Sequence, residues 1–319
     1  MAETMMKTTT DTIASTFPVE YYSRKLLKTL KSRLVYANFG QKRSIPANNG
    51  STIQFRKYSG WDGNTTPLTE GVIPDSLTMT QTDITATVKE YGDWVSLSSK
   101  ASLTALDPIV NDAVDMLGAR AEKSIDMIIR DELKNATNVI FAEKDGVAAA
   151  SASAITPDHI LTTKEIRKAV RFLKKRNADP FYRNGKPYYY CIVDPSAEFD
   201  LQSDPKWEAV ATYQQAEKFE NGELGRMYGV VFIASSEAIK WTGAGASSAD
   251  VYGSIVFGPD AYGQIDIEGK GAVEVYVESG GGVSDPLHQK KTVGYKIPAF
   301  RAKILDNDRI VMIKYGVSA

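Results

Sequence analysis

Residues 107–135 read DPIVNDAVDMLGARAEKSIDMIIRDELKN, and this stretch decides what kind of fold the chain can form. Asp107 is of a type favoured at helix N-caps, and Pro108 suits the first helical position, where no backbone N–H is required. The apolar residues that follow recur every three or four positions, as on one face of a helix. They are Ile109, Val110, Ala113, Val114, Leu117, Ala121, Ile125, Ile128 and Leu133. At 1.5 Å per residue this helix spans roughly 40 Å, which favours a central helix around which a sheet is built.

Before the helix, from residue 51 to residue 97, the pattern changes to that of strands. Apolar and polar residues alternate in Thr52–Arg56, in Leu77–Thr80 and in Ile84–Val88, as in half-buried strands. Between the first two lies the segment 61–74, WDGNTTPLTEGVIP, which is too polar and too rich in turn residues to bury itself. A two-stranded excursion of this length is marginal alone in water. We therefore expect it to need a surface to lie against, and the sequence offers no obvious internal one.

The first 50 residues differ in character from the rest. A polar lead is followed by the segment 18–38, in which apolar residues at helical spacing alternate with lysines and arginines. This pattern predicts a basic amphipathic helix. A nucleic-acid-binding arm and an ordinary solvated helix both fit it, and the solvated helix is the commoner case. Residues 41–50 are rich in turn-forming types and are predicted to be a loop.

After the long helix a small linker, 146–154, leads into a mixed segment. Its predicted elements are a helix over 162–176, a strand over 188–193, a helix over 205–219, a strand over 228–234 and a flexible turn over 241–250. Further strands are predicted over 251–258, 271–278, 292–302 and 309–315. Strands before and after an inserted mixed segment indicate an α+β body interrupted by a second subdomain.

Composition excludes several classes of protein. The 319 residues carry a formal net charge of −1, so no overall positive field points to nucleic acid or to an anionic membrane. The only cysteine, Cys191, excludes an intrachain disulfide and a cysteine-based zinc site, and its apolar neighbours predict a buried strand thiol. No signal peptide is recognisable, and no window approaches the ~18 apolar residues of a membrane helix. We expect a soluble protein with no membrane partner.

No pattern in the chain points to catalysis. The two histidines, His159 and His288, stand about 130 positions apart and belong to no metal-binding motif, so surface or hydrogen-bonded roles are expected. The glycines in 243–248 lack the third glycine of a dinucleotide loop and the strand–loop–helix order that such a loop needs. Glycines 280–282 precede Asp285-Pro286, which predicts a turn. We predict no catalytic residue, no cofactor and no metal.

Three stretches carry a resemblance to a known family. The first is PLTEGVIP at 67–74, followed by VKEYG at 88–92 and VSL at 95–97. The second is DPKW at 204–207, which leads to GELGRMYGV at 222–230. The third is SDPLHQ at 284–289, followed by VGYK at 293–296 and AKIL at 302–305. In this order, with the long helix between the first two, they resemble the major capsid proteins of a podovirus-type family of tailed bacteriophages over nearly the whole chain.

The resemblance implies the α+β capsid fold that tailed phages share with herpesviruses. Each part of that fold has a candidate here. The expected parts are an N-terminal arm at 1–50, an extended hairpin loop at 51–92, a peripheral domain at 93–150 and 251–319 with the long "spine" helix at 107–135, and an axial domain at 151–250.

The resemblance also implies a structural role without enzyme activity. Hexamers and pentamers of the chain would form an icosahedral shell that encloses phage DNA without reading its sequence, in a virion assembled in the host cytoplasm. A portal and a decoration protein are possible partners. Some relatives carry a long N-terminal scaffolding segment that a protease removes, whereas about 50 residues precede the hairpin here, so we expect a separate scaffolding protein.

The hairpin is the predicted contact between subunits. The interface candidates are Trp61, Leu68, Glu70, Val72 and Ile73. Two other functions stay open at this point. An encapsulin-like compartment would use the same fold to hold cargo enzymes, and a cytoplasmic α+β enzyme would be a monomer or small oligomer.

Overall fold

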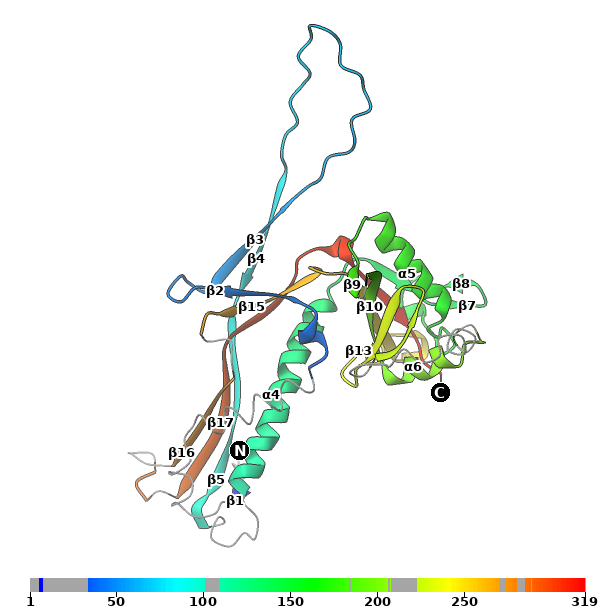
Figure 1. The fold of residues 1–319 in the computed structure, drawn as a ribbon. Helices are drawn as coiled ribbons and strands as arrows, with labels where there is room; N and C mark the ends of the chain where they lie inside the picture. The colour runs from blue at the N-terminus through cyan, green and yellow to red at the C-terminus, as the bar shows by residue number, and fades with distance from the viewer. Residues whose placement is uncertain are drawn as a thin grey trace.

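The computed structural model describes residues 6–7, 34–100, 109–183, 185–205, 207, 223–269, 273–279, 285–287 and 289–318. Within them the protein is elongated, and three parts are visible: a long hairpin that projects from the body, a sheet backed by one long helix, and a second sheet with shorter helices (Figure 1). Several predictions fall outside the described residues. They are most of the basic helix over 18–38, the cap at Asp107-Pro108, most of the helix over 205–219 and most of the turn over 280–287.

The first sheet is six-stranded and brings together segments from both ends of the chain. Its order is β1-β5-β17-β15-β2, and β16 pairs with β17. The strands are β1 (Met6–Lys7), β2 (Gln41–Ile45), β5 (Lys89–Ser98), β15 (Tyr262–Ile267), β16 (Glu274–Ser279) and β17 (Lys290–Ile304). Burial alternates along β17, as expected of a strand with one face on a core. Segment 41–45, predicted to be a loop, is β2 because it pairs in parallel with β15, although only Ile45 is buried.

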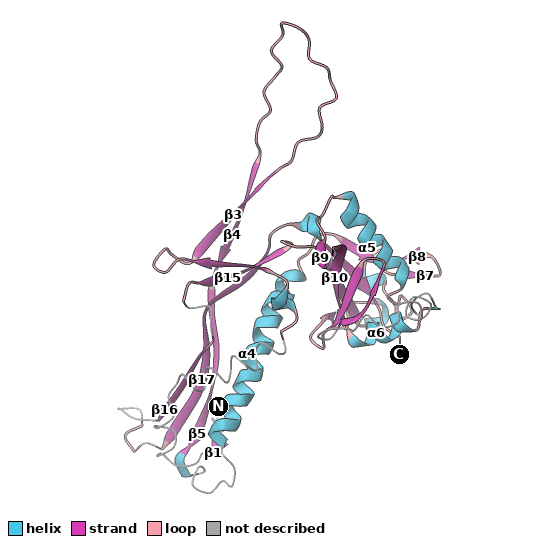
Figure 2. Ribbon diagram, viewed as in Figure 1, coloured by secondary structure: helices cyan, strands magenta, loops and turns pink. Residues whose placement is uncertain are grey.

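Helix α4 (Ile109–Leu133) lies along this sheet, beside β5 and β17 (Figures 1 and 2). Most of the predicted apolar stripe is buried, from Val110 to Ala121 and again at Leu133. Ile125 and Ile128 are half-buried and pack against the same core cluster, whereas Ile129, which the predicted stripe did not include, is fully buried. In this half of the helix the buried face turns toward Glu122 and Asp126, since residues 35–37 pack there and their backbone N–H groups reach Asp126.

The second sheet contains eight strands in the order β11-β12-β10-β14-β18-β6, with β13 on β14 and β9 on β10. The strands are β6 (Val139–Phe141), β9 (Phe181–Arg183), β10 (Lys186–Val193), β11 (Glu223–Met227), β12 (Val230–Ala234), β13 (Ile239–Trp241), β14 (Val251–Phe257) and β18 (Ile310–Tyr315). Helices α5 (Thr163–Lys175) and α6 (Pro195–Gln202) accompany this sheet. Helix α5 begins with a capping box between Thr162 and Glu165, whereas α6 was not predicted.

The two sheets do not divide the chain at the predicted domain boundaries. Strands β14 and β18 lie within 251–319, which was assigned to the peripheral domain, yet β14 pairs with β10 and with β18 in the second sheet. Both are almost continuously apolar and are buried on both faces, as central strands of a covered sheet are. The inserted segment therefore completes its sheet with strands that follow it in the sequence.

The projecting hairpin consists of β3 (Thr52–Tyr58) and β4 (Gln81–Thr87), which pair from Thr52 with Thr87 to Tyr58 with Gln81. The strand predicted at Leu77–Thr80 is instead part of the loop that joins them. Its alternating pattern finds no partner strand, because the opposite residues are the turn-rich stretch after Tyr58. Two short strands, β7 (Glu143–Lys144) and β8 (Val147–Ala148), form a separate small hairpin.

Candidate assembly surfaces

The end of the β3–β4 hairpin is the most exposed part of the described chain, since every residue from 58 to 83 is exposed. Large apolar side chains are among them, including Leu68 at 74% and Ile73 at 93% of full exposure. The others are Tyr58, Trp61, Val72, Leu77 and Met79. Such a concentration of uncovered apolar groups in a soluble protein usually marks an interaction surface.

Little holds the hairpin end to itself. The Trp61 indole N–H donates to the Thr78 carbonyl at 3.1 Å, and the Val72 N–H donates to the Thr69 carbonyl at 3.2 Å. The segment 58–83 also contains four acidic residues and no lysine or arginine. The acidic residues are Asp62, Glu70, Asp75 and Asp83. A surface that covers this end therefore has to accept apolar groups and negative charge together.

The base of the hairpin is fixed to the body. Ala86 packs in a small buried cluster with Ile45 and Ile265 of the first sheet. The Lys57 ammonium lies 2.6 Å from Asp306 and 3.4 Å from Asp308. Burial by itself lowers the pKa of Lys57, but the hydrogen bonds and charges of these two aspartates outweigh it and raise the pKa above its ordinary value. A fixed base with a free end is the geometry of an arm that reaches another molecule.

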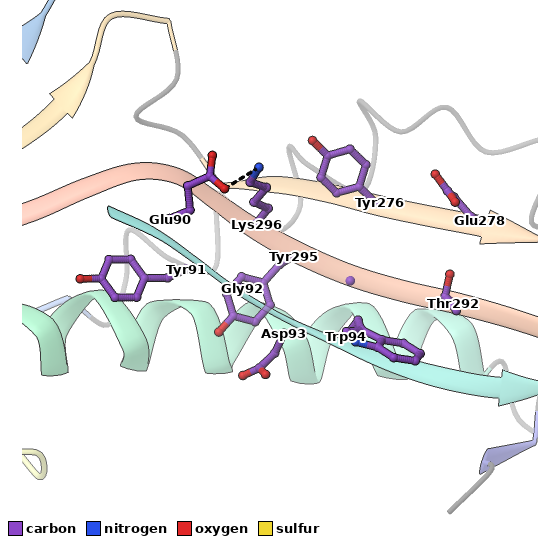
Figure 3. Close-up of a pocket in the computed structure, with 11 residues that line it drawn as sticks. Glu90, Tyr91, Gly92, Asp93, Trp94, Tyr276, Glu278, Thr292, Tyr295 and Lys296 are labelled. Carbon is purple, nitrogen blue, oxygen red and sulfur yellow. Dashed lines mark ion pairs between the residues drawn. The ribbon is translucent and has the colours of Figure 1, made fainter. Parts of the chain in front are cut away.

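A second exposed feature lies on the face of the first sheet that points away from α4. Cross-strand register places Trp94, Gly294 and Tyr276 in one row across β5, β17 and β16. Because the central position is a glycine, the two exposed aromatic rings border an open trough of about 610 Å³, of the size of a ligand cleft. Figure 3 shows its lining, including the ion pair between Glu90 Oε2 and Lys296 Nζ at 3.1 Å.

The opposite face of the same strands is closed by the long helix. Tyr295, next to Gly294, is buried, and its hydroxyl lies 3.1 Å from the Ser124 hydroxyl of α4. The trough was not predicted from the sequence. In the sequence the only sign of the trough is Trp94, an aromatic residue on the polar face of β5. The residues that lie beside Trp94 across the sheet, Gly294 and Tyr276, become known only with the strand register.

The structure places all five predicted interface residues on the exposed hairpin end. Their role in subunit contacts stays a prediction, because the structure contains a single copy of the chain. The thiol of Cys191 is fully buried, as predicted, and burial raises its pKa well above the ordinary value. His159 is buried and hydrogen-bonded, with the Thr156 backbone N–H 3.1 Å from Nδ1. His288 lies outside the described residues.

The described residues offer neither a metal site nor a membrane-spanning helix. They contain no group of three histidine, cysteine or acidic side chains arranged to hold a metal ion. No helix among them has the length and apolarity needed to cross a membrane.

A projecting hairpin, a sheet backed by one long helix and a second sheet built around an insertion together define the fold class of tailed-phage capsid proteins. The comparisons with known proteins agree. The sequence model of the phage capsid protein family matches residues 81–313, which is most of the chain, and the chain belongs to this family. It is a structural protein of the virion capsid. A comparison with curated protein sequences gave no match.

Solved structures show the same fold at low sequence identity. A capsid chain of cyanophage Pam1 is 14% identical with a TM-score of 0.69, over 88% of this chain and 89% of that one. A capsid chain of Ralstonia phage GP4 is 15% identical with a TM-score of 0.67, over 91% of both chains. The virus-like particle from Pyrococcus furiosus is 12% identical with a TM-score of 0.50, over 92% of this chain and 98% of that one. The predicted α+β capsid fold is confirmed.

Proposed function

We propose that the protein assembles into hexamers and pentamers that close into an icosahedral shell around phage DNA, and that the β3–β4 hairpin is a main contact between copies. The observation that carries the proposal is the uncovered apolar end of the hairpin in a chain of the phage capsid family. Docking on a neighbouring copy would remove these groups from water, and edge strands could add backbone hydrogen bonds.

The energy available at each hairpin is moderate. Full burial of a leucine, isoleucine or valine side chain contributes about 1.5–3 kcal/mol, so Leu68, Val72 and Ile73 could contribute several kcal/mol per contact. Ordering the loop opposes part of this gain. A closed shell repeats the same contact around every ring, so a weak contact at each site is sufficient for a stable assembly.

The other partners belong to the same proposal. A separate scaffolding protein would guide assembly in the host cytoplasm, a portal would occupy one vertex and a decoration protein could bind outside. The net charge of −1 suits a chain that encloses DNA without reading its sequence.

Replacing residues 59–80 with a short Gly-Ser turn tests the role of the hairpin. The turn would join Tyr58 to Gln81, the last paired residues, so β3, β4 and the buried cluster at their base stay intact. We expect folded subunits or small oligomers by size exclusion and circular dichroism, and no shells by negative-stain microscopy. A full-length variant with Leu68, Val72 and Ile73 all changed to serine should give the same result. Intact shells from both variants would remove the hairpin from the assembly mechanism.

The contents of purified particles separate the two compartment functions. A similar fold occurs in the Pyrococcus furiosus virus-like particle, so the fold alone leaves an encapsulin-like role open. Membership of the phage capsid family favours DNA as the content. Particles from infected cells that hold DNA support the proposal, whereas particles that hold a protein cargo and no DNA contradict it. A monomeric protein with enzyme activity would contradict both.

A further inference from the structure

The exposed face of α5 carries a cluster of positive charge. Arg167, Arg171, Lys174 and Lys175 lie on this helix at spacings of four, three and one residues and extend over about 12 Å of its axis. Together with Tyr228, from the β11–β12 turn, they border an open groove of about 450 Å³. Among the residues that the structure describes, none of these four cations has an acidic partner.

This isolation contrasts with the other cations of the same helix. Lys164 and Lys168 both pair with Glu143 across the gap between α5 and β7. Within the described part of the chain, one side of α5 is therefore neutralised internally and the other side stays positive. Lys174 and Lys175 lie in the last turn, where they also stabilise the helix dipole, but Arg167 and Arg171 are too far from the helix end for that explanation.

Tyr228 has an unusual backbone conformation that holds its ring at this groove. It is the first residue of the two-residue turn between β11 and β12, with φ of 52°, and Gly229 follows with φ of 78°. Such turns favour asparagine, aspartate or glycine, and a tyrosine there is strained. The Arg167 guanidinium lies 5.3 Å from the centre of its ring, so the strained residue restrains the arginine.

We propose that this face of α5 binds the phosphate backbone of nucleic acid without reading its sequence. The inference rests on the proposed shell function, which supplies DNA as the polyanion. Duplex DNA presents a negative charge about every 1.7 Å, so four cations over this length meet several phosphates in any register. A protein partner fits less well, because the centre of a protein interface is depleted of charged side chains and four of the six residues that border this groove are cations.

Two variants of the full-length chain, each lacking three positive charges, test the site. The first carries Arg167→Gln, Arg171→Gln and Lys174→Gln. The matched control carries Lys144→Gln, Lys164→Gln and Lys168→Gln, whose cations are already paired with Asp158 or Glu143. Binding of unassembled protein to a fluorescent 30-base-pair duplex is measured by anisotropy over a range of salt concentrations. We expect the first variant to bind at least tenfold more weakly and to lose about three units of the log–log salt slope, and the control to keep most of the slope.

Equal slopes for the wild type and the first variant would overturn the inference. The inference would also be overturned if poly-glutamate displaced the fluorescent duplex as strongly as unlabelled DNA of equal charge does. That result would favour an acidic protein partner. Shell formation, followed by negative-stain microscopy, keeps this test separate from the proposed function. Normal shells from the first variant with weakened DNA binding support the site. Loss of shells with unchanged DNA binding would make this face a contact between copies and refute the inference.

Discussion

Asp126 connects residues 35–37, within the predicted N-terminal arm, to the long helix, and its removal is the most informative single change. Its carboxylate oxygen Oδ1 accepts the backbone N–H groups of Val35, Tyr36 and Ala37 at 3.2, 2.9 and 3.4 Å. Burial raises the pKa of Asp126 from 3.8 to about 6, although these hydrogen bonds and Arg130 lower it. The side chain therefore supplies an acceptor that the fold needs and a charge that the fold disfavours.

The two contributions are separable with two variants. Asp126→Asn keeps an acceptor and removes the charge, whereas Asp126→Ala removes both. The alanine variant leaves buried N–H groups without an acceptor, so we expect it to be about 1–3 kcal/mol less stable than the asparagine variant at every pH. This difference measures the acceptor alone.

The wild type compared with the asparagine variant measures the charge. Because the pKa of Asp126 is higher in the folded state than in the unfolded state, ionisation of its carboxyl group lowers the free energy of unfolding. This loss of stability is complete above pH 6. As the pH falls from 6 toward 4, the folded state takes up its proton before the unfolded state does. The wild type should then gain stability relative to Asp126→Asn, by at most about 3 kcal/mol for a shift from 3.8 to about 6.

Urea unfolding between pH 4.5 and 8, followed by tryptophan fluorescence, gives these free energies. The protein has to be kept unassembled, as checked by size exclusion, because assembly adds its own stability. A difference between the wild type and Asp126→Asn that stays constant over this pH range would show that the carboxylate is not buried as described.

Three further changes test other parts of the fold. Ile129→Asp places an unpaired charge in the core and should give unfolded or insoluble protein. Ile125→Asp, at a half-buried position, should stay soluble and lower the midpoint of urea unfolding. Equal loss of stability in the two variants would contradict the burial pattern of α4. Tyr228→Asn relieves the strained turn and should raise stability by about 1 kcal/mol in urea unfolding, and a loss of stability would refute the strain. Gly258→Ala puts a Cβ 2.5 Å from a backbone carbonyl oxygen and should lower the melting temperature by several degrees, so an unchanged value would show that the backbone relaxes freely.

Local patterns in the sequence were sufficient for much of the architecture. The apolar repeat after Asp107-Pro108 predicted α4, and alternation predicted β3, most of β4 and most strands after residue 186. The polar composition of 61–74 predicted an end that cannot bury itself, and the structure leaves it exposed. These features depend on residues within one or two turns or strands of each other, so short stretches of sequence contain the whole signal.

Only the tertiary structure decided which distant segments meet. The Asp126 carboxylate lies in the buried face of α4 because backbone groups some 90 positions earlier donate to it, and Ile129, outside the predicted stripe, is fully buried on the same helix. Strand β18 completes the sheet of the insertion, and the row from Trp94 to Tyr276 exists only in the register that β17 imposes. Periodicity states which side of an element is apolar, but the partner that covers that side is selected by the packing of the whole chain.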